Sequence, residues 1–264
     1  MIYVILLALC LGASAVGSIV GAGGGVIIKP MVDLFGLLPV SVNSFCAGCT
    51  VLSMSVVSLI RGRKSEAKLR LRMTIPLAIG AVLGGFVGKW LFEMVRQSFG
   101  DENVLGAVQA LVLTVITALV LLYVCKKDKI RAMNVQSIPA ALVIGGCLGV
   151  ISTFLGIGGG TSNVAVLFFF FSMDAKEAAK NSLFIIMCSQ TASIATSLVN
   201  GTVPDFSLPI LLSMIAGGVA GAQIGAFYSK RLKTKGVEKL LKLLLVVIIC
   251  IDLYNCVKFS ILIF

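Results

Sequence analysis

Two runs of glycine interrupt long apolar segments, and they constrain the fold of this chain more than any other feature. The first run is residues 21–25 (GAGGG) and the second is residues 156–160 (GIGGG). Glycine inside a helix costs about 1 kcal/mol relative to alanine, so each run predicts a helix break. Breaks at membrane depth persist only where the freed backbone lines a cavity or packs on protein.

The composition indicates a helical membrane protein that crosses the bilayer many times. Of the 264 residues, 58% are hydrophobic and 12% are charged, and this charged fraction is about half that of a soluble domain. Apolar stretches of about 20 residues, the length that crosses a bilayer, recur along the chain. We therefore expect an all-α, multi-pass protein of the plasma membrane with about 8–10 membrane segments.

The residue inventory argues against an enzyme and against a nucleic-acid-binding protein. The chain contains no histidine, which removes the commonest general base and metal ligand. We expect no catalytic residues, no metal and no cofactor. Cys46 and Cys49 have the spacing of a redox or zinc pair but lack a second pair, so we interpret them as packing residues. The net charge of +11 comes from short basic loops, so we expect no nucleic-acid partner.

The basic loops predict the orientation in the membrane. Lysine and arginine are concentrated in residues 61–72, 126–131 and 230–235, which places these loops in the cytoplasm and both termini outside. We expect apolar segments between these loops at about residues 2–20, 26–38, 42–60, 73–95, 104–125, 138–155, 161–173, 183–199, 208–228 and 240–264.

The two halves of the chain, residues 1–131 and 132–264, read as two repeats. A gap-free alignment pairs the two glycine runs, and a shifted alignment pairs the GGxxG motif at 84–88 with that at 217–221. Spaced small residues of this kind let helix backbones approach closely, so we interpret them as packing ridges.

The charge pattern predicts how the repeats are related. The segment that ends at Arg61 must end in the cytoplasm, because a basic loop follows it. Its repeat mate ends in an uncharged turn at Asn200 and must end outside. Corresponding segments therefore run in opposite directions. The sequence predicts inverted repeats, each with one glycine-broken helix pair.

The breaks are candidate binding sites. A helix that restarts after a break exposes free N–H groups and the positive end of its dipole, which favours an anion. Inverted symmetry brings both restarts towards the midplane, and paired breaks are the usual pointer to a transporter's substrate site. The alternative is that they are packed hinges without a ligand. Candidate ligands lie at or near the breaks: Gly23, Gly24, Gly25, Lys29, Gly158, Gly159, Gly160, Thr161, Ser162, Asn163, Asn181, Ser182 and Gln190.

Several of these side chains have a second interpretation. Asn181, Ser182 and Gln190 suit a polar lining, but they equally suit helix capping and hydrogen bonds between helices. Lys29 either binds the anion or extends to the membrane surface. Asp33 lies one turn after Lys29 and can pair with it. Because acids inside a membrane are costly and usually functional, Asp33 is the candidate for coupling to a proton or a sodium ion.

Two further pairs of charges lie within apolar segments. Lys89 and Glu93 have the spacing of an ion pair on one helix face, and we interpret them as an interfacial pair. Asp252 and Lys258 have no predicted partner, and either an oligomer interface or the exterior remains open for them.

The two glycine runs, Pro30 after the first of them and the AAKNS sequence at 178–182 together resemble the sulfite exporter TauE/SafE family of membrane transporters. The GGxxG motifs add to the resemblance, which covers nearly the whole chain. It implies transport of small sulfur oxyanions or organosulfonates, such as sulfite or sulfoacetate, usually outward. The chain departs from the family pattern at residues 161–163, where Thr-Ser-Asn replaces more apolar residues and a following proline, and at residues 46–47, where Cys-Ala is less polar than usual.

We therefore predict a secondary transporter that exports a small anion by alternating access between inverted repeats. An anion channel, or a transporter of another small organic anion, is the alternative. The expected partners are the anion, a coupling proton or sodium ion, the lipid bilayer and a second copy in a homodimer.

Overall fold

The computed structural model describes residues 2–64, 67–127, 130, 132–157 and 159–263. These residues form ten α-helices and one short 3-10 helix, and no strand occurs among them. The α-helices are α1 (Ile2–Val20), α2 (Gly25–Phe35), α3 (Val40–Arg61), α4 (Leu71–Phe99), α5 (Glu102–Lys126), α6 (Ile138–Leu155), α7 (Gly160–Phe171), α8 (Ala175–Val199), α9 (Leu208–Arg231) and α10 (Thr234–Ile263), and the 3-10 helix is η1 (Gly62–Lys64).

Both predicted helix breaks are confirmed. Residues 21–24 separate α1 from α2, and the stretch from 156 to 159 separates α6 from α7. Gly21 has a φ of 79° and Gly159 a φ of 89°, values that residues with a side chain rarely adopt. Eight helices in the described part of the chain are long and apolar enough to cross a membrane. The other two, α2 and α7, rise only about 17 Å each.

The expected boundaries hold closely for most helices, but α8 begins earlier than its apolar residues indicate. We expected this segment from residue 183, and the helix starts at Ala175. The Asp174 side chain accepts hydrogen bonds from the backbone N–H groups of Lys176 and Glu177, at 2.8 and 2.9 Å. This N-cap starts the helix two turns before the hydrophobic stretch.

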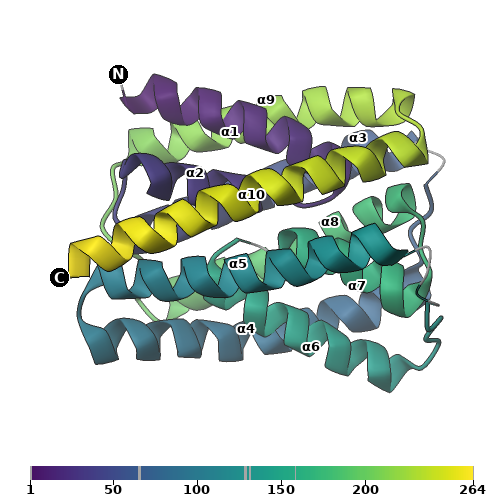
Figure 1. The fold of residues 1–264 in the computed structure, drawn as a ribbon, viewed down its shortest axis with the longest axis horizontal. Helices are drawn as coiled ribbons and strands as arrows, with labels where there is room; N and C mark the ends of the chain where they lie inside the picture. The colour runs from purple at the N-terminus through teal and green to yellow at the C-terminus, as the bar shows by residue number, and fades with distance from the viewer. Residues whose placement is uncertain (1, 65–66, 128–129, 131, 158, 264) are drawn as a thin grey trace.

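The helices divide into two groups (Figure 1). In the upper part of the view α1 packs along α9, with α2 and α3 beside them. In the lower part α4 packs along α6, with α7 and α8 beside them. Helices α5 and α10 pack against each other in front of both groups. Each group therefore mixes helices from both predicted repeats.

Glycine makes the two long seams tight enough for backbone contact. A Cβ atom built on Gly84 of α4 would lie 2.0 Å from the carbonyl oxygen of Gly146 in α6. One built on Gly221 of α9 would lie 2.2 Å from that of Leu11 in α1. Real Cβ contacts are longer than 3.0 Å, so only glycine fits at either position. The interpretation of these motifs as packing ridges is confirmed.

The predicted pairing of the two GGxxG motifs was wrong by one helical turn. Gly80 faces the carbonyl of Leu142, and Gly217 faces the carbonyl of Leu7. Leu142 and Leu7 hold matching positions when counted back from their glycine runs. The structural partner of Gly217 is therefore Gly80 rather than Gly84.

The direction of the helices agrees with the orientation that the charges predict. The ends of α3, α5 and α9, which lead into the basic loops, lie on the right in Figure 1, and both termini lie on the left. Helix α1 runs from left to right, whereas α6 runs from right to left, and α5 and α10 also run in opposite directions. An inverted repeat predicts opposite directions for such pairs, and the repeat itself stays a prediction.

Candidate functional site: two vestibules at the helix breaks

The two glycine breaks meet in the interior. A Cβ atom built on Gly25 would lie 2.5 Å from the carbonyl oxygen of Ile157, and one on Gly160 would lie 1.7 Å from Cγ2 of Val26. Val26 and Ile157 are buried. We expected the anion to lie between the two restarts. In this conformation the restarts instead pack tightly against each other through apolar side chains and backbone.

A cavity of about 280 Å³ lies on the side of this contact towards the basic loops. We call it the inner vestibule; it is lined by parts of α1, α3, α8 and α9 and by residues 62 and 67. The hydroxyls of Ser18 and Ser58 are 2.7 Å apart in its wall. Its described lining residues include Lys176, Lys180 and Lys230 and no acid. The Lys180 ammonium also donates to the Ala67 carbonyl at 2.9 Å.

A second, smaller cavity of about 40 Å³ lies on the other side of the contact, lined by α3, α4, α6, α8 and the turn after α8. We call it the outer vestibule. Three charged residues of α4 line it, and Glu93 pairs with Lys89 at 3.0 Å and with Arg96 at 3.4 Å. The interpretation of Lys89 and Glu93 as an ion pair is confirmed. Thr153 and Gln190 also line this cavity.

The two vestibules are built from matching positions. Ser18 precedes the first glycine run by as many residues as Thr153 precedes the second, and Ser58 corresponds in the same way to Ser193. Ser18 and Ser58 line the inner vestibule, whereas Thr153 and Ser193 line the outer one. The same wall positions therefore serve opposite sides of the contact between the breaks, and the inner vestibule is the larger of the two.

Comparison with known proteins places this architecture in a family. Residues 5–251 match the family described as "Sulfite exporter TauE/SafE". The chain belongs to the sulfite exporter TauE/SafE family. It is also similar to the "Probable membrane transporter protein YunE" of Bacillus subtilis (strain 168), with 22% identity over 277 residues that cover 97% of this chain and 98% of the relative. No solved structure matches.

Family membership and the apolar helices make this chain a multi-pass membrane transporter of the TauE/SafE type. This is a transporter family and not an enzyme family. The sequence resemblance on which we based the transport role is thereby confirmed.

In this TauE/SafE transporter, the predicted ligands at the breaks are packed rather than exposed. A Cβ atom built on Gly23 would lie 2.8 Å from the Ile186 side chain, and one built on Gly24 would lie 2.8 Å from the Met54 sulfur. Thr161, Ser162 and Asn163 are buried, and Asn163 Oδ1 has no hydrogen-bond partner in the described part of the chain. The Ser162 hydroxyl donates to the Gly159 carbonyl. Gly158 lies outside the described residues.

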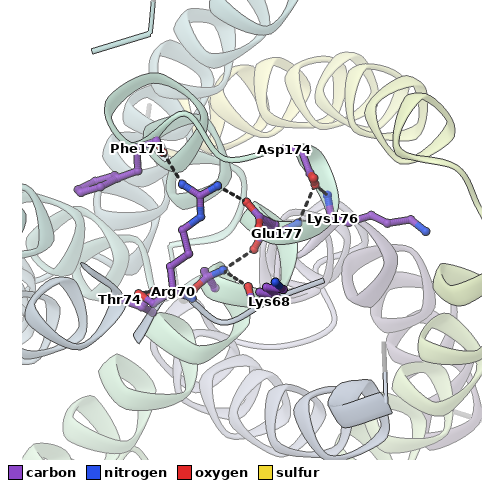
Figure 2. A network of polar contacts seen from close by, with 8 residues as sticks. Lys68, Arg70, Thr74, Phe171, Asp174, Lys176 and Glu177 are labelled. Atoms are coloured by element: carbon purple, nitrogen blue, oxygen red, sulfur yellow. Dashed lines mark hydrogen bonds and ion pairs between the residues drawn. The ribbon is translucent and has the colours of Figure 1, made fainter. Parts of the chain in front are cut away.

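Asn181 joins α8 to the chain that leads into α4. Its Oδ1 accepts from the Arg70 backbone N–H at 3.0 Å and from the Thr74 hydroxyl, and its Nδ2 donates to the carbonyls of Lys68 at 3.0 Å and Glu177 at 2.7 Å. Figure 2 shows the surrounding network, in which Arg70 also pairs with Glu177 at 2.6 Å. The Asn181 amide is saturated in this conformation.

The other two predicted ligands on α8 differ from each other. The Ser182 hydroxyl donates to the Gly21 carbonyl at 2.7 Å and so supports the first break. Gln190 is buried in the wall of the outer vestibule, and its Nε2 has no partner among the described residues. It faces Gly48 of α3, where a Cβ atom would lie 2.8 Å from Gln190 Oε1.

Lys29 and Asp33 line neither vestibule. They form a buried ion pair at 3.0 Å, as their spacing indicated, and Asn43 donates to the second carboxylate oxygen at 2.7 Å. The pair faces α10, where Asp252 and Lys258 lie. Lys258 donates to the backbone carbonyl of Asp33 at 2.8 Å.

For Asp252 the two alternatives, an oligomer interface or the exterior, were wrong, because Asp252 is buried inside the chain. Lys258 is half-buried and donates to backbone carbonyls at the carboxyl end of α2. A cation at this end of a helix is favourable because it offsets the helix dipole. The sequence did not show that α10 packs on α2, so it did not predict that Asp252 and Lys258 lie near Lys29 and Asp33.

Proposed function

We propose that this transporter exports a small anion, such as sulfite, sulfoacetate or a related organosulfonate, by alternating access between its two repeats. The observation that carries the proposal is the pair of vestibules at matching positions on opposite sides of the contact between the breaks. A carrier needs two access routes that open in turn, whereas a channel needs one continuous route. The packed contact between Gly25 and Ile157 favours the carrier.

The charge of the inner vestibule favours an anion that enters from the cytoplasm. Lys176 and Lys230 belong to its described lining, and basic side chains in a cleft raise the local concentration of anions. In its wall the Ser18 and Ser58 hydroxyls bond to each other at 2.7 Å, and an oxyanion would take over a donor from this pair. The cavity wall also includes Ala179, which packs on Gly21 of the first break. An anion in this position lies beside the break.

The two glycine seams suit a mechanism in which groups of helices move as units. Contacts through the backbone join α1 to α9 and α4 to α6, and such contacts leave no room for sliding. Movement is then expected at the surfaces between the groups, which include the surface where α3 meets α8. Because α3 and α8 line both vestibules, a tilt that opens the outer vestibule closes the inner one.

Counterflow in proteoliposomes tests the proposal. We expect labelled sulfoacetate to enter vesicles faster when unlabelled sulfoacetate is inside, because a carrier exchanges its substrate. Replacing both vestibule hydroxyls, in the Ser18→Ala/Ser58→Ala variant, is expected to slow counterflow, and Ser260→Ala on α10 is the matched control. Uptake without this stimulation would identify a channel. Absence of uptake with sulfite, sulfoacetate, taurine and simple carboxylates would overturn the proposed substrate class.

A further inference from the structure

A small pocket with polar lining residues lies apart from both vestibules, between α2, α5, α10 and the end of α6. Its volume of about 10 Å³ is close to the smallest that holds one water molecule. Its polar lining residues are Lys29, Asp33, Gln109, Asp252 and Asn255.

The charges of this pocket do not balance if every group is ionised. The Lys29 ammonium is paired with Asp33 at 3.0 Å, and both side chains are at most 6% exposed. Asp252 is 1% exposed, and its Oδ2 has no hydrogen-bond partner among the described residues. Two carboxylates then face one ammonium. A buried, uncompensated carboxylate costs several kcal/mol, so Asp252 requires a proton or another cation.

The neighbouring amides are oriented to receive a proton. Asn255 Nδ2 donates to the Pro30 carbonyl at 2.9 Å, and Gln109 Nε2 donates to the Phe154 carbonyl at 2.6 Å. The amide oxygens of Asn255 and Gln109 are consequently left without partners in the described structure. An ionised Asp252 cannot bond to these oxygens because all of them are acceptors. A protonated Asp252 carries a donor in the pocket that these acceptors line.

The other charged groups favour a proton over a sodium ion. The Lys29 ammonium lines the same pocket and repels a second cation, whereas a neutral Asp252 leaves the Lys29–Asp33 pair balanced. Lys258 on the same helix is bound to backbone carbonyls of α2. Helices α1, α6 and α7 carry no charged residue, and those of α3, α5 and α8 lie near the helix ends.

The second repeat lacks the charges that α2 contributes to this pocket. Counted from the glycine runs, Lys29 and Asp33 correspond to Val164 and Phe168 of α7, which are buried apolar residues. Helix α7, which corresponds to α2 in the second repeat, therefore packs without any charged residue. The charges on α2 are an addition that packing does not require.

We propose that Asp252 is the proton-binding site of this transporter and that its proton is taken from and returned to water during the transport cycle. The protonated carboxyl fits the conformation described here. Once the proton leaves, Asp252 competes with Asp33 for the Lys29 ammonium, and this displaces α2. The first residues of α2, Gly25 and Val26, form the contact between the breaks, so the displacement acts on the barrier between the vestibules. The coupling role rests on the proposed transport function, whereas proton binding does not.

Infrared spectroscopy of the purified protein tests proton binding directly. We expect wild-type protein at neutral pH to show the C=O stretching band of a protonated carboxyl, and we expect Asp252→Asn to lack it. The substitution keeps the size of the side chain, so the melting temperature checks that the variant is folded. Asp205→Asn, at an exposed position after α8, is the control and keeps the band. A wild-type spectrum without an Asp252-dependent band overturns the proposal, and so does a band that disappears when sodium replaces choline.

Transport tests the coupling role separately. In proteoliposomes a pH gradient is expected to drive sulfoacetate accumulation by wild-type protein, and Asp252→Asn is expected to lose this accumulation while it keeps counterflow. Gradient-driven accumulation by Asp252→Asn, or wild-type counterflow without any response to the gradient, overturns coupling through Asp252. Absence of counterflow in the wild type overturns the proposed function instead, and the infrared band still decides proton binding.

Discussion

Alanine at Gly25 is predicted to force the two helix breaks apart. The added Cβ atom would lie 2.5 Å from the Ile157 carbonyl oxygen, about half an ångström inside the closest contact that real Cβ atoms make. The φ angle of Gly25 is not positive, so alanine brings no backbone strain and the effect is purely steric. Overpacking of this kind costs about 1–3 kcal/mol. That cost corresponds to roughly a 5- to 150-fold change in the population of the packed conformation.

The assay for Gly25→Ala is sulfoacetate counterflow in proteoliposomes, together with the melting temperature in detergent. We expect counterflow to fall by at least about fivefold. Gly12→Ala is the matched control, because no atom lies within 4 Å of a Cβ atom at this position of α1. There alanine is expected to be neutral or to stabilise the helix by up to about 1 kcal/mol. Wild-type transport and melting temperature in Gly25→Ala would refute the contact between the breaks.

Three other predictions concern stability. Gly84→Ala, whose Cβ would meet the Gly146 carbonyl oxygen at 2.0 Å, is expected to lower stability to unfolding in detergent by about 1–3 kcal/mol. Gly146→Ala, whose Cβ would meet only the Gly80 carbonyl oxygen at 3.8 Å, should be neutral, and equal effects of the two substitutions would argue against the seam between α4 and α6. Asn181→Ala removes the amide that holds the chain before α4 and should cost about 1–3 kcal/mol, with faster trypsin cleavage in the basic loop after α3; unchanged cleavage would contradict this anchoring. Lys29→Met breaks a buried ion pair, which costs about 3–5 kcal/mol, and should lower the melting temperature more than Lys89→Met does, because the pair of Lys89 is more exposed; equal shifts would count against the buried cluster.

Local chemistry made the helix breaks predictable from the sequence. Glycine at 21 and 159 adopts positive φ angles, so the residue type itself marks where the helices break. The basic loops predict the cytoplasmic ends because charge placement follows the membrane and not the packing, and this orientation stays a prediction. The start of α8 was missed because a polar capping residue, Asp174, sets it.

The parts that the sequence did not predict depend on which helices touch. Nothing in the sequence of α10 shows that Asp252 faces α2, so its role emerged only from the pocket it shares with Lys29. Asn181 is a residue type that often binds ligands. Only the fold shows that the chain before α4 already occupies the hydrogen-bonding groups of its amide. The alignment paired Gly217 with Gly84 instead of Gly80, one helical turn away, because glycines spaced every four residues align equally well in several registers.

Cysteine labelling at the two matching positions tests alternating access most directly. In a variant without native cysteines, Ser58→Cys reports on the inner vestibule and Ser193→Cys on the outer one. The account predicts that any condition that slows labelling at one position, such as a reversed sulfoacetate gradient, accelerates labelling at the other. Labelling rates that rise and fall together, or simultaneous access to both positions from one side of the membrane, would contradict it.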